Sequence, residues 1–183
     1  MATALTTLPN VKQWLKINGT ADDALLTRLI TSFSSAVANY LNRDLGSQVY
    51  TEVYNGGGGR SLALANYPVT AVASLTINDE PIPQQPKAGA IGFVPSPYRV
   101  NLVGYTYTAG FQNVTVTYTA GYVTIPADVE QCCIEWIADR YAQRDRIGIA
   151  SRGVGGETQV FSVVDMPPAV KQILNPFVKV IPV

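Results

Sequence analysis

The 183-residue sequence contains no histidine. A chain without histidine cannot build a Ser-His-Asp or Cys-His catalytic arrangement, a histidine-ligated zinc site or a histidine pH switch. Its two cysteines, Cys132 and Cys133, are adjacent, so the spacing of a cysteine zinc site is missing too. Neighbouring side chains of a helix point about 100° apart, and we expect two buried free thiols. No constellation for catalysis is present, and we expect no cofactor, no metal and no enzymatic activity.

Charge is scarce and balanced. Thirteen basic and thirteen acidic residues give a formal net charge of zero, and only 14% of the residues are charged. An average domain has about 25% charged residues, and a general nucleic-acid binder needs a basic surface. The composition therefore argues against general nucleic-acid binding. It favours a subunit of an assembly, because copies with little charge repel each other weakly.

Long apolar runs are missing as well. No run approaches the roughly 18 residues of a membrane-spanning helix. Residues 1–8 lack the basic start and the apolar stretch of a secretory signal. We therefore expect no membrane association and a soluble protein of the cytoplasm.

The strongest helical pattern spans residues 125–148. Its apolar residues recur at helical spacing, and its first turn is acidic, as helix starts favour. Arg140 and Arg144 continue almost the same line as Cys133 and Ile137, so the face predicted to be buried becomes basic halfway along. At that point the helix either leaves the core or meets an acidic partner.

Other elements precede and follow this helix. Apolar spacing predicts helices over residues 9–17 and 20–46, the second one capped by Thr20. Alternating β-branched and aromatic residues predict strands between residues 49 and 122, and Asn55-Gly56 predicts a hairpin joining two paired strands. A short strand over 159–164 and a short helix over 169–174 are expected near the end.

These elements predict an α+β fold. We expect a small helical bundle with an inserted antiparallel β domain, sandwich or barrel-like, and an extended C-terminal tail. The expected divisions are 1–47 for the first helical part, 48–123 for the β insert, 124–148 for the long helix and 149–183 for a flexible tail.

Two glycine-rich segments invite a nucleotide-binding interpretation. Residues 56–59 lie between strands and are not followed by the lysine and helix of a phosphate-binding loop. Residues 153–156 follow a helix, whereas a dinucleotide-binding glycine motif follows a strand. We interpret the first segment as a turn and the second as a connector.

Charged side chains form two rows on the long helix. Glu135 and Asp139 lie four residues apart on one face, and Arg140 and Arg144 repeat this spacing on another. One hypothesis is that the acidic row of one subunit pairs with the basic row of the next in a ring. The alternative is that the rows are solvated or pair within the chain, with Asp22 or Asp44.

Several segments in order give the chain a resemblance to a known family. They are VKQWLKI, DDALLTRLI, ANYLNRDL, TEVYNG, YPVTAV, VTYTAGY, IPADVEQ, RDRIG and MPPAVK, which begin at residues 11, 22, 38, 51, 67, 116, 125, 144 and 166. With this ordered set, which covers most of its length, the chain resembles the head-tail connector (adaptor) proteins of long-tailed double-stranded DNA bacteriophages.

The resemblance implies a structural virion protein. Its subunits would form a ring of about twelve under the portal, in the neck of the virion, after assembly in the host cytoplasm. The implied partners are other copies of the chain, the portal protein, the next neck or tail protein, and double-stranded DNA that passes through the channel without sequence-specific binding. The tail would contact the portal through five apolar anchors, Phe161, Val163, Ile173, Leu174 and Phe177.

Two alternatives remain open. One is another ring protein of the phage neck, a stopper or a tail-completion subunit. The other is a carbohydrate-binding module on the β insert, with a platform of Tyr50, Tyr54, Tyr98, Tyr105 and Tyr107.

In the ring interpretation, the candidate residues to face DNA are Arg28, Arg60, Arg99 and Arg152.

Overall fold

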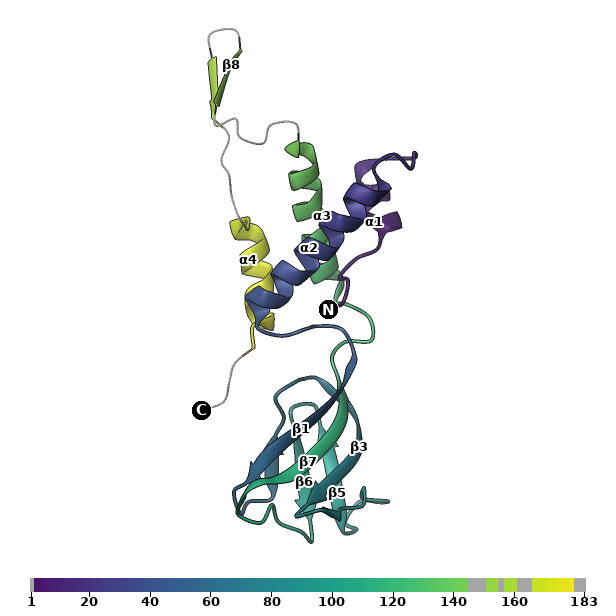
Figure 1. Cartoon of the computed structure of the whole chain (residues 1–183), viewed down its shortest axis with the longest axis vertical. Helices are drawn as coiled ribbons and strands as arrows, with labels where there is room; N and C mark the ends of the chain where they lie inside the picture. The colour runs from purple at the N-terminus through teal and green to yellow at the C-terminus, as the bar shows by residue number, and fades with distance from the viewer. Residues whose placement is uncertain (1, 145–150, 155–156, 161–165, 180–183) are drawn as a thin grey trace. The chain divides into compact units, whose positions relative to one another are not determined.

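The chain divides into two compact units (Figure 1). The computed structural model describes residues 2–144, 151–154, 157–160 and 166–179. One unit is helical and combines Met1–Asp44 with Ile125–Val180, whereas the other, Leu45–Thr124, is built from strands. The β unit is thus inserted into the helical unit, and the α+β class predicted from the sequence is confirmed.

The described part of the helical unit contains four α-helices. They are α1 (Leu8–Leu15), α2 (Asp23–Leu41), α3 (Ala127–Ala142) and α4 (Pro168–Leu174), and a 3-10 turn, η2 (Asn175–Phe177), follows α4 directly. α2 packs on α3 through Phe33 and Trp136, whose ring centres lie 4.3 Å apart. α1 contacts both of these helices, and α4 contacts α3.

The first two helices end earlier than their apolar spacing predicts. Lys16 and Asn42 adopt left-handed backbone conformations, with φ of 57° and 54°, and each stops its helix there. The prediction of Thr20 as the cap of α2 is wrong. The helix follows Asp22, and Thr20 contributes its carbonyl oxygen, which accepts a hydrogen bond from the Asp23 N–H at 3.2 Å.

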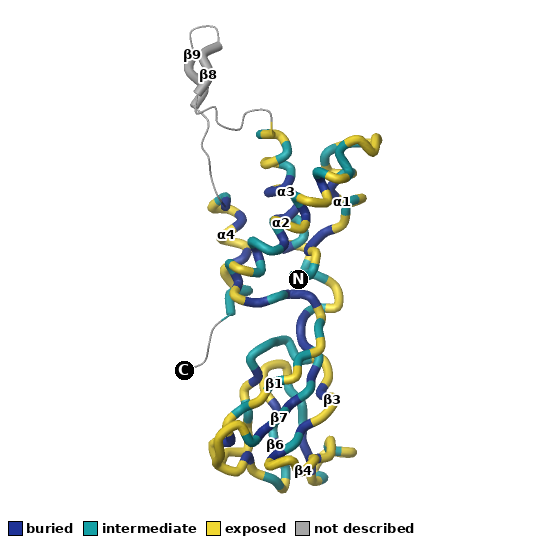
Figure 2. Tube along the Cα trace, in the orientation of Figure 1, coloured by how far each residue is buried: buried dark blue, intermediate teal, exposed yellow. Residues whose placement is uncertain are grey.

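Each of the four helices buries apolar side chains, and the buried residues of the chain are dark blue in Figure 2. Burial of such side chains provides most of the stability of short helices. The buried side chains include Val11, Leu26, Ile30, Val37, Leu41, Val129, Cys132, Cys133, Trp136, Ile137, Val170 and Leu174.

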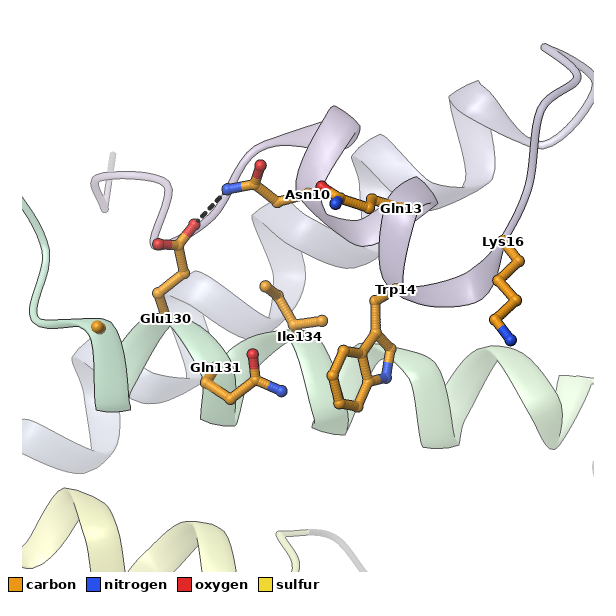
Figure 3. A pocket seen from close by; sticks show the side chains of 8 residues that line it. Asn10, Gln13, Trp14, Lys16, Glu130, Gln131 and Ile134 are labelled. Carbon is orange, nitrogen blue, oxygen red and sulfur yellow. Dashed lines mark hydrogen bonds between the residues drawn. The ribbon is translucent and has the colours of Figure 1, made fainter.

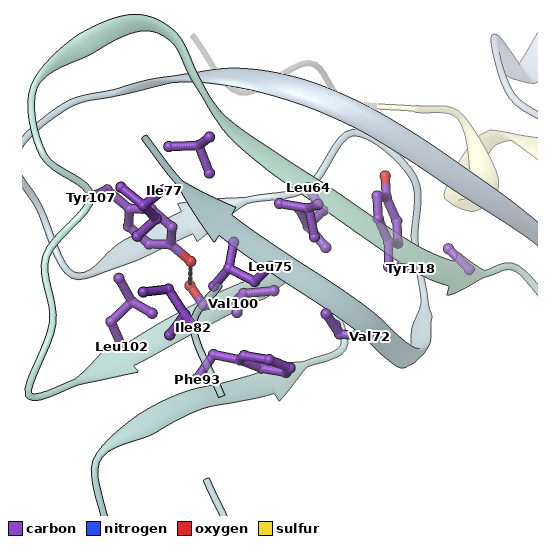
Figure 4. Close-up of a cluster of buried hydrophobic side chains, with 13 residues drawn as sticks. Leu64, Val72, Leu75, Ile77, Ile82, Phe93, Val100, Leu102, Tyr107 and Tyr118 are labelled. Atoms are coloured by element: carbon purple, nitrogen blue, oxygen red, sulfur yellow. Dashed lines mark hydrogen bonds between the residues drawn. The ribbon is translucent and has the colours of Figure 1, made fainter. Parts of the chain in front are cut away.

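The β unit is a sandwich of two antiparallel sheets and not a closed barrel. One sheet has the order β1-β7-β3-β4, formed by β1 (Gln48–Gly56), β7 (Gly110–Ala120), β3 (Val69–Ile77) and β4 (Glu80–Pro81). The other has the order β2-β6-β5, formed by β2 (Ser61–Ala63), β6 (Arg99–Val103) and β5 (Gly92–Ser96). Their inner faces share a core that includes Val72, Leu75, Phe93, Val100, Leu102, Val116 and Tyr118 (Figure 4).

The hairpin predicted at Asn55-Gly56 is wrong. β1 pairs with β7, which begins more than fifty residues later, and β2 pairs with β6 in the opposite sheet. The glycines carry the chain from one sheet to the other, held by hydrogen bonds of Gly58 and Gly59 with Tyr107. The local turn signal was correct, but both strands have an apolar face and cover the same core from opposite sides, which a hairpin pairing would prevent.

The C-terminal part contains a short hairpin and α4. β8 (Ser151–Val154) and β9 (Glu157–Val160) pair antiparallel. The strand predicted over 159–164 overlaps β9, and its remainder lies outside the described residues, as does the predicted end of the long helix at Gly148. α4 begins one residue before the helix predicted over residues 169–174 and ends at the same residue.

Candidate assembly interface

The two cysteines and the possible metal ligands of the chain show no reactive arrangement in the described residues. Cys132 and Cys133 are free and buried. Burial raises the pKa of the Cys132 thiol and raises that of Cys133 to about 12, so both thiols are neutral and poor nucleophiles. In residues 2–144 and the described C-terminal segments, no three His, Cys, Asp or Glu side chains gather as a metal site would require.

No helix in the described part of the chain combines the length and the apolar character that crossing a bilayer requires.

The acidic row predicted on α3 is exposed and ordered by neighbours on the same helix. Glu135 accepts a hydrogen bond from Gln131 Nε2 at 2.9 Å, and Asp139 accepts two from Gln143 Nε2 at 2.8 Å. Both carboxylates face solvent. Glutamine donors four residues away hold these side chains in place without adding a positive charge, so the row keeps its acidic character.

The basic row is exposed too, because the end of α3 extends past the core. Arg140 and Arg144 face solvent, although they continue the line of the fully buried Ile137. The guanidinium of Arg144 lies over the Tyr141 ring, 4.0 Å from its centre, and its Nη1 donates to the Tyr141 carbonyl oxygen at 2.9 Å. Of the two outcomes expected for this helix, leaving the core is the one observed.

The two acids considered as intrachain partners of the arginines have other contacts. Asp22 accepts a hydrogen bond from the Tyr141 hydroxyl at 2.7 Å, and Asp44 accepts one from the Thr3 N–H at 2.8 Å. These contacts fasten α3 and the N-terminal segment to the two ends of α2. Both charged rows are exposed, and another molecule can therefore reach them.

A groove between α1 and α3 lies next to the acidic row (Figure 3). It has a volume of about 710 Å³ and is lined by Trp14 and Gln13 of α1 and by Ile134 and Gln131 of α3, among others. The Trp14 side chain is 51% exposed, whereas Ile134 is 6% exposed and forms part of the apolar lining. In the sequence, Val11 and Trp14 share one face of the helix predicted over residues 9–17, which favours burial of both, so this surface was missed.

Polar contacts fix α1, and with it the groove. Asn10 Nδ2 and Thr6 Oγ1 both donate to Glu130 Oε1 of α3, at 2.7 and 3.1 Å. Lys12 forms an ion pair with Asp23 of α2 at 2.6 Å. The groove is therefore preformed, which lowers the entropy cost of binding a partner.

The five predicted portal anchors are in different environments. Phe161 and Val163 lie outside the described residues. Ile173 is 39% exposed and Phe177 is half-buried, but Leu174 is 0% exposed in the core of the helical unit. Leu174 was placed wrongly among the surface anchors: α4 packs on α3, and a fully covered side chain cannot reach a partner without leaving that core.

The tyrosines proposed as a carbohydrate platform do not share a surface. Tyr107 is 2% exposed and donates to the Val100 carbonyl oxygen at 3.1 Å. Tyr50, Tyr54 and Tyr105 pack against the core of the β unit, whereas Tyr98 is 60% exposed. These positions give no support to a carbohydrate-binding module.

The arginines considered as DNA-facing residues are scattered over different elements. Arg28 lies on α2, Arg60 in the turn before β2, Arg99 at the start of β6 and Arg152 in β8. The first three are exposed and lie on separate elements.

Solved structures with a similar fold come from gene transfer agent (GTA) particles. One, titled as the neck of an empty GTA particle computed with C6 symmetry, has a TM-score of 0.63 and 16% identity, and the match covers 100% of this chain and 95% of that one. A chain from the virion of a native gene transfer agent (GTA) particle has a TM-score of 0.62 and 18% identity, covering 100% and 94%. A third, from a native GTA neck computed with C12 symmetry, has a TM-score of 0.56 and 17% identity, covering 100% and 97%. At this identity they establish a shared fold.

A search of curated protein sequences finds no match. A family model described as head completion protein matches residues 4–180, which is almost the whole chain. This match confirms the resemblance to head-tail connector proteins that the ordered sequence segments indicated. The chain belongs to the head completion protein family and is a structural protein of the head-tail connection.

Proposed function

We propose that the protein forms a ring in the virion neck, directly under the portal, after assembly in the host cytoplasm. The ring would extend the DNA channel, let double-stranded DNA pass without sequence-specific contacts and offer a surface to the next neck or tail protein. The similar chains from GTA necks that were computed with C6 and C12 symmetry support a cyclic arrangement. We infer that the protein acts by binding and has no enzymatic activity.

The observation that carries this proposal is the pair of oppositely charged rows on α3. A ring requires two different surfaces on each subunit, each complementary to the other. Glu135 with Asp139 and Arg140 with Arg144 provide such surfaces. All four are exposed; the first three lie on α3 and Arg144 follows its C-cap, Gln143. We propose that the acidic row of one subunit binds the basic row of the next.

Exchange of charges tests this contact. The double variants Glu135→Arg/Asp139→Arg and Arg140→Glu/Arg144→Glu each carry two surfaces of the same sign, and neither should form rings alone. An equal mixture should form rings in which the variants alternate, and native mass spectrometry would report their mass. Rings from either variant alone, or no ring from the mixture while the natural protein forms them, would disprove the pairing.

The portal contact is proposed for the C-terminal segment. Of the predicted anchors, Ile173 is exposed and Phe177 is half-buried, and Phe161 and Val163 stay as candidates on the sequence alone. Deletion of residues 157–183 would be a poor test, because it removes the buried Val170 and Leu174 and disturbs the helical unit.

Point substitutions test the portal contact more cleanly. Ile173→Asp with Phe177→Ala should lower co-purification with the cognate portal protein while the melting temperature changes little. Gln172→Ala, an exposed neighbour on α4, is the matched control. Portal binding equal to that of the natural protein would disprove the assignment, and binding only to tail-side neck proteins would favour a stopper or tail-completion role.

A further inference from the structure

Trp14 is the largest exposed apolar side chain of the helical unit, with 51% of its surface accessible. Exposed apolar surface next to polar side chains often marks a contact with another protein. Interface residues that contribute most to binding are enriched in tryptophan and arginine. The indole also lies in a groove whose α1 wall is fixed by the contacts of Asn10 and Lys12.

The Trp14 groove and the acidic row form one continuous surface. Gln131 lines the groove and donates a hydrogen bond to Glu135 at 2.9 Å. Glu130, another lining residue, adds a further carboxylate, and Asp139 follows one helical turn beyond Glu135. This surface therefore combines an aromatic ring with several negative charges, which is the environment that a guanidinium group prefers.

The basic row lies on the opposite side of α3. Glu135 and Arg140 are five residues apart on α3, and five steps of ~100° bring Arg140 to about 140° from Glu135 around the helix axis, while Arg144 follows the helix end at Ala142. The two surfaces therefore cannot meet within one helix. Each one can meet its counterpart on a neighbouring copy, which is the condition for a head-to-tail contact that repeats around a ring.

We propose that the groove at Trp14 binds the guanidinium of Arg144 from a second copy of this chain. The inference rests on the proposed ring and assigns Trp14 as the central aromatic contact of its subunit interface. The arginine would stack on the indole while Glu135 and Asp139 accept its hydrogen bonds and those of Arg140. Arginine fits better than lysine, because its planar group can stack on the ring and donate sideways at the same time. DNA fits less well, because the groove and its border carry three carboxylates, those of Glu130, Glu135 and Asp139, against one cation, Lys16.

Photo-cross-linking tests the contact directly. Trp14 is replaced by p-benzoylphenylalanine in the full-length protein, rings are irradiated, and cross-linked peptides are identified by mass spectrometry. We expect cross-links from position 14 to residues 140–144 of another chain, shown to be intermolecular by mixing isotope-labelled and unlabelled protein. If rings form but position 14 cross-links only to residues outside 140–144, the inference is overturned while the proposed ring still stands. The absence of rings with and without portal protein would instead count against the proposed function.

Substitutions provide a second test. Trp14→Ala should weaken ring association about tenfold, the effect of losing one cation–π contact of ~1–2 kcal/mol. Trp14→Phe should weaken ring association less. The Arg144→Lys variant should associate more weakly than the natural protein but more strongly than the Arg144→Ala variant. Ser32→Ala, exposed on α2 and outside the groove, is the matched control. Equal association by Trp14→Ala and the control would contradict the proposal, and unchanged melting curves would show that the effect is not one of folding.

Discussion

The hydroxyl of Tyr118 on β7 donates a hydrogen bond to the carboxylate of Glu52 on β1. Glu52 also accepts from the hydroxyl of Tyr54 and from Asn66 Nδ2, the latter at 3.0 Å. The two hydroxyl oxygens in turn accept hydrogen bonds from the backbone. The Ala65 N–H donates to Tyr54 at 2.9 Å, and the Asn66 N–H donates to Tyr118 at 3.1 Å. One carboxylate thus ties the segment between β2 and β3 to the paired strands β1 and β7.

Removal of this carboxylate should destabilise the β unit. Glu52→Ala leaves the hydroxyls of Tyr54 and Tyr118 without their acceptor, and we expect a loss of about 1–3 kcal/mol in the free energy of unfolding. Glu52→Gln keeps a carbonyl oxygen and should cost less. Chemical denaturation followed by tyrosine fluorescence measures both variants. An equal effect of alanine and glutamine would show that the acceptor is not what matters.

Alkaline pH should weaken the same unit. Burial and the hydrogen bond with Glu52 raise the pKa of Tyr118 from 10.0 to about 12, and burial raises that of Tyr54 further. The folded state therefore holds protons that the unfolded chain loses above pH 10. The contribution of these two tyrosines to the free energy of unfolding should be constant below pH 10 and should fall as the pH rises towards 12. Thermal melting at several pH values measures the slope, which should be shallower in Tyr118→Phe.

Gly56 should not tolerate a side chain. A Cβ at this position would overlap the carbonyl oxygen of Thr108, so Gly56→Ala must move backbone and should cost at least about 1–3 kcal/mol. A Cβ added at Gly57 would meet nothing within 4 Å, and Gly57→Ala should be neutral or slightly stabilising. Denaturant titration of the two variants gives the free energy of unfolding of each and so compares two adjacent positions. A similar loss in both would mean that the turn needs flexibility in general.

The two cysteines should report the opening of the helical unit. Both thiols are buried, and the pKa of Cys133 is raised to about 12, so neither should react with iodoacetamide at pH 8 in the folded protein. In 6 M guanidinium both should react within minutes. Rapid labelling of the native protein would contradict the packing of α2 on α3.

The sequence predicted the start and the buried face of α3, because its apolar spacing and acidic first turn agree locally, but it carried the helix beyond Ala142, where α3 ends. Its charged rows were found from spacing alone, since residues four apart on a helix share a face whatever surrounds them. The role of Trp14 could not be found in this way. The same spacing that groups it with Val11 also fits a residue at the edge of the core, and only the position of α3 decides how far it is covered.

The strand pairing shows the same limit in the β unit. Local residues identified the strands and the turn at Gly56, but the partner of β1 lies in β7, far along the chain. Such pairings depend on which apolar faces share a core, and a nearby turn signal says nothing about that.

By itself, the sequence determined the α+β class, the inserted β region, the charged rows of α3 and the lack of histidine chemistry. These depend on residue types and on spacing within single elements. The tertiary structure decided that β1 and β2 belong to opposite sheets, that Leu174 is buried and that Trp14 is exposed. Pairing and burial are set by elements distant in the chain, whose packing settles which faces are covered and which are left to a partner.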